Sequence, residues 1–114
     1  AIIDALCGAL NLGDIGQHFP NTPSNKNISS IKLLKKIMSL IPSNISIINI
    51  DASIILNNPK ISKYKSKIIS KLAPVLNIPE SQISIKGITS NGLSFLNMKN
   101  GWGAEVIISL KKWK

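Results

Sequence analysis

Arginine is absent from this 114-residue sequence, although 14 lysines against five acidic residues give it a net charge of +9. Readout of base edges and bidentate binding of phosphate rely mainly on arginine, and aromatic residues make up only 4% of the chain. We therefore expect no nucleic-acid partner. The charge is interpreted either as a solvated lysine-rich surface, encoded by an AT-rich gene, or as a surface that attracts anions.

Cysteine and histidine are nearly absent, with one residue of each, Cys7 and His18. A single cysteine excludes a disulfide within the chain, and a single histidine cannot by itself make a zinc site. We interpret His18 as a loop side chain with no special role. Walker and nucleophile-elbow sequences are also missing, which disfavours covalent catalysis confined to this chain. No apolar run approaches the roughly 18 residues of a membrane span, so we expect no membrane partner.

Isoleucine, in contrast, is abundant at 22 residues. A chain of this length is expected to form a single domain, residues 1–114, with one core, so part of this β-branched surface should lie in a subunit interface. The sequence begins at Ala1, already inside a helical pattern and without a methionine. We therefore expect that it is truncated at its N-terminus.

Apolar spacing predicts three helices. Residues 1–10 have near-helical spacing, and Ile31, Leu34, Met38 and Ile41 form the stripe of a second helix, with Ser29 or Ser30 as its N-cap and Pro42 as its stop. A third helix is marked by Ile61, Ile68, Leu72 and Val75, with Lys63, Lys67 and Lys71 facing water and Pro74 bending or ending it.

Three strands are predicted at residues 45–56, 83–89 and 104–110. In the first, Ile48, Ile50, Ala52, Ile54 and Leu56 should form the buried side. This order of elements indicates an α+β fold, with a mixed or antiparallel sheet of about four strands and helices on one face. The fourth strand is expected to precede Ala1.

Three segments have the composition of ligand-binding loops, although each could also be an ordinary connection. Residues 13–16 place Asp14 between two glycines, where a carboxylate could accept hydrogen bonds from ribose hydroxyls. Residues 56–62 follow a strand with an irregular backbone that could read a base edge. Residues 88–92 offer two adjacent hydroxyl groups and backbone N–H groups suited to phosphate oxygens.

In this order the motifs resemble those of the 2-C-methyl-D-erythritol 2,4-cyclodiphosphate synthases, enzymes of the non-mevalonate isoprenoid pathway. The likeness covers the whole chain, and the segment at residues 12–22 is its most specific part. The motifs are Asp-Ala-Leu at 4–6, Leu-Gly-Asp-Ile-Gly at 12–16, Phe-Pro at 19–20 with Thr22, Pro59-Lys60, Ile85-Lys86 before Thr89, Leu93 with Phe95, and a Gly-x-Gly strand at 101–110.

The resemblance implies a homotrimer with active sites between neighbouring subunits. It also implies a reaction in which the 2-phosphate of 4-diphosphocytidyl-2-C-methyl-D-erythritol 2-phosphate attacks the β-phosphorus of the same molecule and expels CMP. Thr89 matches the threonine that stabilises the phosphoryl transition state. The substrate-binding positions carried over are Asp14, Ile15, Gly16, Phe19, Pro20, Asn21, Thr22, Pro23, Leu56, Asn57, Asn58, Pro59, Lys60, Ile61, Ser62, Ile88, Thr89, Ser90, Asn91, Phe95 and Lys99.

Each group of positions has its own expected ligand. Asp14, Ile15 and Gly16 should contact the ribose or diphosphate, and residues 19–23 should line the loop over the methylerythritol phosphate. Residues 56–62 should hold cytosine, mostly through backbone groups, while Phe95 and Lys99 complete the phosphate side. The family also implies a bacterial cytoplasm or a plastid-type organelle.

Several positions depart from the family pattern. Asn21 and Pro23 stand where acidic residues are usual, and Asn91 stands at the position of a magnesium-binding glutamate. The complete family enzyme uses zinc together with magnesium or manganese. Its zinc ligands are expected upstream of Ala1, so we expect no stoichiometric zinc in this chain alone. The chain is interpreted as the C-terminal part of a working enzyme or, alternatively, as a non-catalytic homologue that binds cytidine nucleotide or acts through its trimer interface.

Overall fold

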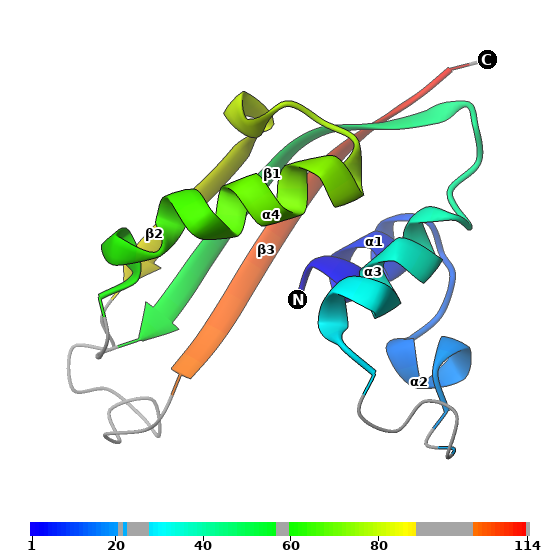
Figure 1. Cartoon of the computed structure of the whole chain (residues 1–114). Helices are drawn as coiled ribbons and strands as arrows, with labels where there is room; N and C mark the ends of the chain where they lie inside the picture. Colours follow the sequence, from blue (N-terminus) through cyan, green and yellow to red (C-terminus); the bar gives the residue numbers. More distant parts are fainter. Residues whose placement is uncertain (21, 23–27, 57–59, 89–101, 114) are drawn as a thin grey trace.

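The computed structural model describes residues 1–20, 22, 28–56, 60–88 and 102–113. Figure 1 shows a twisted sheet with one long helix lying across it and two shorter helices beside each other near one edge. Along the chain the elements are α1 (Ile2–Ala9), α2 (Ile15–His18), α3 (Ser30–Met38), β1 (Ile45–Leu56), the 3-10 helix η2 (Ile61–Lys63), α4 (Lys65–Leu76), the 3-10 helix η3 (Glu80–Gln82), β2 (Ile83–Ile88) and β3 (Trp102–Lys112).

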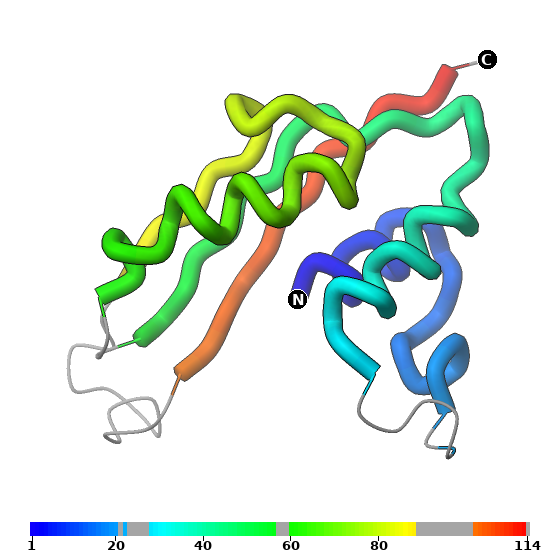
Figure 2. The backbone as a smooth tube through the Cα atoms, viewed as in Figure 1, coloured from blue at the N-terminus to red at the C-terminus, as the bar shows by residue number. Residues whose placement is uncertain are grey.

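The sheet is mixed, as expected. The strand order is β2-β1-β3, with β1 parallel to β2 and antiparallel to β3. A parallel pair needs a crossover connection, and α4 with its flanking 3-10 turns supplies it between β1 and β2. Figure 2 shows β1 and β3 side by side, although they are far apart in the sequence. The described residues therefore supply three of the roughly four strands expected for the whole sheet.

The helices cover one face of the sheet, which confirms the predicted layer arrangement. Ile50 and Ala52 of β1 and Ile85 of β2 are buried on that face, where they share one core with Leu6 of α1 and Ile37 of α3. Alternate residues of a strand point to opposite faces, so the period-two pattern of β1 was sufficient to predict which residues are buried in its centre.

The opposite face of the sheet is not covered by any helix within the described ranges. Ile107 of β3 is 71% exposed there, and Ile88 of β2 is also exposed. On the same face, the Lys86 ammonium lies 3.0 Å from a carboxylate oxygen of Asp51. Exposed β-branched side chains on an uncovered sheet face are typical of a surface that is buried in an assembly.

One residue of the predicted buried face of β1 was placed wrongly. Ile48 is 43% exposed, whereas its neighbour Ile47 is only 7% exposed. The pairing of β1 with β3 shifts register between Ile47 and Asn49. Such a β-bulge adds one residue to a strand and reverses which neighbours face inward.

The ends of two helices show how local signals fixed their boundaries. The hydroxyl of Ser29 accepts the backbone N–H of Lys32 at 3.2 Å, so of the two predicted candidates, Ser29 and Ser30, Ser29 is the N-cap of α3. α3 ends at Met38, before Pro42.

Pro74 does not end α4, which continues to Leu76 and stops at Asn77 in the left-handed conformation. Asparagine tolerates that conformation, and the N–H of Ile78 closes the end on the Ala73 carbonyl.

Candidate functional site

The segment that was expected to be either a turn or a ligand loop begins a short helix. Asp14 is the N-cap of α2: its carboxylate accepts the backbone N–H of Gln17 at 2.9 Å. In return, the side-chain oxygen of Gln17 accepts the backbone N–H of Asp14 at 2.9 Å. This capping box satisfies two backbone donors at the helix start and fixes the carboxylate of Asp14 at an exposed position.

Gly13 makes this capping box possible. Its φ is +86°, and a Cβ at this position would overlap the Oε1 atom of Gln17. Only glycine avoids both the strained backbone and this overlap. The Gly-Asp-Ile-Gly motif is therefore a device that positions Asp14, in addition to the ligand contacts expected from the family.

His18 closes the same segment at its other end. Its Nε2 atom lies 2.6 Å from the carbonyl oxygen of Leu12, so this nitrogen donates its proton to the carbonyl. The neighbouring Phe19 is half-buried, and the ammonium of Lys36 on α3 lies 5.9 Å from the centre of its ring. That His18 ties Leu12 to the end of α2 could not be predicted from local sequence signals, because this contact depends on how the chain turns between them.

A second group of predicted residues lines a pocket at the ends of two parallel strands. β1 ends at Leu56 and β2 at Ile88, and the pairing of Ile55 with Ile88 brings these ends together. The pocket encloses about 320 Å³. We call it the strand-end pocket, and its lining residues are Leu56, Lys60, Ile61, Ser62, Lys65, Gly87 and Ile88. Ligands of α/β sheets bind at this end of parallel strands.

Two lining residues of the strand-end pocket, Lys65 and Gly87, were missed by the sequence analysis. A Cβ on Gly87 would overlap the Cγ2 atom of Ile61, so glycine allows η2 to pack closely against β2 and shapes one wall. A glycine within a predicted strand was the available signal for such a close approach. The signal for Lys65 was its position on the apolar stripe of α4.

The structure does not bring all predicted site residues together within one chain. α2, which Asp14 begins, lies beside α1 and α3 on one side of the molecule, whereas β1 and β2 end near the start of α4 on the opposite side. Figure 1 shows this separation directly. The strand-end pocket is thus remote from the predicted site residues on the other side of the same chain, which are Asp14, Ile15, Gly16, Phe19, Pro20 and Thr22.

Ten predicted positions lie outside the described residues: Asn21, Pro23, Asn57, Asn58, Pro59, Thr89, Ser90, Asn91, Phe95 and Lys99. Thr89 follows Ile88 of the strand-end pocket directly in the sequence.

The described residues do not supply a set of side chains that could hold a metal ion. Within it, no group of three or more His, Cys, Asp or Glu side chains is close enough together to hold one. Asp4 and Glu105 line the same pocket, but two carboxylates fall short of the three protein ligands of a catalytic zinc site. Burial raises the pKa of the Cys7 thiol, and the nearby charges of Asp4 and Asp14 add to this, so Cys7 disfavours the thiolate form that binds metals.

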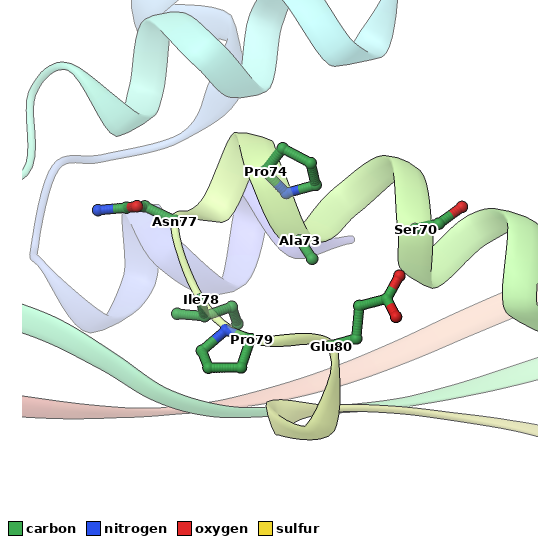
Figure 3. A pocket seen from close by; sticks show the side chains of 7 residues that line it. All are labelled: Ser70, Ala73, Pro74, Asn77, Ile78, Pro79 and Glu80. Carbon is green, nitrogen blue, oxygen red and sulfur yellow. The ribbon is translucent and has the colours of Figure 1, made fainter.

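A larger depression, of about 480 Å³, lies where α4 ends and η3 begins (Figure 3). Its lining includes Ser70, Asn77 and Glu80 but no lysine and none of the residues predicted to bind ligand. Its one charged group is a carboxylate, which would repel phosphate. The strand-end pocket therefore remains the better candidate for an anionic ligand. No helix in the described ranges is long and apolar enough to cross a membrane.

Sequence comparisons agree with the motifs. The profile of the YgbB family matches residues 1–111. The chain is similar to the 2-C-methyl-D-erythritol 2,4-cyclodiphosphate synthase of Clostridium kluyveri, with 46% identity over 112 residues, which are 96% of this chain and 68% of that protein. Similarity to the enzyme of the same name from Caldicellulosiruptor bescii is 41% over 110 residues, covering 95% of this chain and 70% of that protein.

Solved structures show the same fold. The chain is similar to IspF of Plasmodium falciparum in its CDP complex, with a TM-score of 0.86 and 37% identity over 100% of this chain and 69% of that one. It is also similar to the bifunctional IspDF of Campylobacter jejuni, with a TM-score of 0.88 and 33% identity over 97% of this chain and 31% of that one.

Proposed function

The chain belongs to the YgbB family of 2-C-methyl-D-erythritol 2,4-cyclodiphosphate synthases, and on this premise we propose that its strand-end pocket binds the cytidine of the substrate while Asp14 of a neighbouring subunit completes the site. The reaction is the cyclisation of 4-diphosphocytidyl-2-C-methyl-D-erythritol 2-phosphate with release of CMP. The relatives compared above carry the name of the synthase, which favours the enzyme over a homologue that only binds nucleotide.

The composition of the strand-end pocket supports a nucleotide ligand. Leu56, Ile61 and Ile88 provide apolar walls, and Ser62 provides a hydroxyl group. Beside them the last residues of β1 and β2 leave backbone groups at the open end of the sheet, where a base edge can be hydrogen-bonded. The Plasmodium falciparum relative was solved with CDP. Within this chain, cytosine is therefore assigned to the strand-end pocket.

Asp14 is assigned to a neighbouring subunit because of its position. One carboxylate oxygen of Asp14 is used in the capping box, and the carboxylate as a whole is exposed. A carboxylate accepts several hydrogen bonds, so Asp14 can also accept from ribose hydroxyl groups. Figure 1 shows α2 and the ends of β1 and β2 on opposite sides of one chain, and the strand-end pocket lies at those strand ends, so a single ligand can meet both only at a junction between two subunits.

A homotrimer would provide three such junctions. Ile107, which is 71% exposed on the uncovered face of the sheet, supplies apolar surface for association. A cyclic arrangement joins one surface of each subunit to a different surface of the next, which is the relation that α2 and the strand-end pocket require.

The chemistry assigned to this chain is positioning and charge stabilisation. The attacking 2-phosphate oxygen forms a bond to the β-phosphorus as the bond from that phosphorus to the oxygen of CMP breaks, and CMP leaves with the electron pair. The Thr89 hydroxyl would donate to a phosphoryl oxygen in the transition state, and Ser90, Phe95 and Lys99 would complete the phosphate side. We place the protein in a bacterial cytoplasm or a plastid-type organelle, in keeping with bacterial and Plasmodium relatives.

Mixing two inactive variants of the complete enzyme tests the shared site. Asp14→Asn keeps a good N-cap but removes the charge, and Thr89→Ala removes the proposed catalytic hydroxyl. Each variant alone should release CMP very slowly. After the two are unfolded and refolded together, about a quarter of the sites should combine an intact Asp14 with an intact Thr89, and CMP release should recover to about that fraction.

The control is the same mixture combined without unfolding, in which the subunits do not exchange. No recovery in the refolded mixture, with trimers of mixed composition shown by native mass spectrometry, would mean that Asp14 and Thr89 of the same chain act together.

A further inference from the structure

Lys65 occupies an unusual place on its helix. Lys65, Ile68 and Leu72 of α4 follow one another at intervals of three and four residues, which is the spacing of a single helix face. Ile68 and Leu72 pack against the core, and Lys65 is half-buried. Lys63, Lys67 and Lys71, which were predicted to face water, are exposed. Lys65 is thus a charged residue on the inward stripe of α4.

The surroundings of Lys65 leave its charge uncompensated. Its side chain has no hydrogen-bond or ion-pair partner among the described residues. The sequences of η2, α4 and β2 contain no acidic residue, and Asp51, on the uncovered face of the sheet, is paired with Lys86. Lys60 lines the same strand-end pocket. This pocket therefore has two cations and no carboxylate among its described lining residues.

A half-buried lysine is not the side chain that packing alone would favour. Lysine stems can lie along apolar surface while the ammonium reaches water, but an apolar residue of similar length would fill this stripe without the desolvation cost. A pocket that concentrates positive charge attracts anions. The strand-end pocket thus suits a ligand that combines a flat ring, which can stack on its apolar walls, with negative charge.

We infer that Lys65 binds the phosphate of the cytidine nucleotide, a role that rests on the proposed function of the strand-end pocket. The ammonium group is a compact point charge that forms strong hydrogen bonds with phosphate oxygens, whereas neutral cytosine gains much less from it. Lys65 thus makes the pocket prefer nucleotides over the nucleoside. Ile61 and Ile88 contact the base, and Lys65 gives the site its preference for charge.

Titration calorimetry with CMP, CDP and cytidine separates these roles. Lys65→Met should weaken the binding of CMP and CDP by about tenfold or more, the usual scale for a charge-assisted hydrogen bond. Binding of cytidine, which has no phosphate, should change by less than about twofold. Lys67→Met removes the same charge from an exposed position on the same helix, and it should change none of the three affinities by more than about twofold.

The remaining outcomes are also decisive. Lys65→Arg keeps the charge and should retain most of the CMP affinity. Thermal unfolding should show that Lys65→Met and Lys65→Arg are both folded. Unchanged CMP binding in Lys65→Met, or an equal loss for CMP and cytidine, would overturn the phosphate role and leave the pocket assignment intact. If the unaltered protein binds neither CMP nor CDP, both the proposed function and this inference are wrong.

Discussion

Replacing Thr89 with alanine should lower the turnover of the complete enzyme by about a hundredfold or more, while its affinity for CMP falls by less than about threefold. Removing a single donor that stabilises transition-state charge commonly costs this much in kcat. CMP contains only the leaving half of the reacting diphosphate. Its affinity therefore measures ground-state binding, to which the Thr89 hydroxyl is not expected to contribute. The measurements are CMP release under single-turnover conditions and a calorimetric titration with CMP.

A conservative variant provides the control for this prediction. Thr89→Ser keeps a hydroxyl group and should recover much of the turnover lost in Thr89→Ala. Equal losses of turnover and CMP affinity in Thr89→Ala would show that Thr89 binds the nucleotide and has no separate effect on the transition state.

Replacing Gly13 with alanine should destabilise the protein by about 2 kcal/mol and abolish most of its activity. The positive φ of Gly13 costs an alanine roughly 1 kcal/mol. The new Cβ also displaces the Gln17 side chain, which breaks its bond to the Asp14 backbone, and the loss of a capping interaction costs roughly another 1 kcal/mol. Urea unfolding and CMP release measure the two effects.

Gly8 offers a matched control for this substitution. It lies in α1 with nothing within 4 Å of the position that a Cβ would occupy. Gly8→Ala should therefore leave activity unchanged and stabilise the protein by up to about 1 kcal/mol, because alanine favours a helix more than glycine does. A Gly13→Ala protein as stable and active as Gly8→Ala would show that the capping box does not hold Asp14 in place.

Local signals in the sequence were sufficient where one face of an element is buried. The boundaries of β1, residues 45–56, were predicted as observed, because the apolar pattern of the strand stops at Asn57-Asn58-Pro59, residue types that end strands. The start of α3 was predicted to within one residue, with Ser29 or Ser30 as its N-cap, because a serine before an apolar helical stripe is a local signal. Boundaries that depend on other parts of the fold were less accurate: β3 begins at Trp102 and ends at Lys112, beyond the predicted 104–110.

Long-range contacts explain what the sequence could not predict. The bulge at Ile48 depends on the register between β1 and β3, which are distant in the sequence. The strand-end pocket depends on the parallel pairing that brings Leu56 and Ile88 to the same edge. The motifs named most of its lining. The place of Lys65 on the apolar stripe of α4 can be read from the sequence, but its assignment to this pocket depends on the packing of η2 and α4 against β2.

The central claim is that one cytidine nucleotide is bound jointly by the strand-end pocket of one subunit and Asp14 of the next. A crystal structure of the protein with bound CDP tests it most directly. We expect the base among Leu56, Ile61 and Ile88, with the ribose hydroxyl groups within hydrogen-bond distance of the Asp14 carboxylate of a neighbouring subunit. CDP bound entirely within one chain, or bound away from the strand-end pocket, would contradict this account.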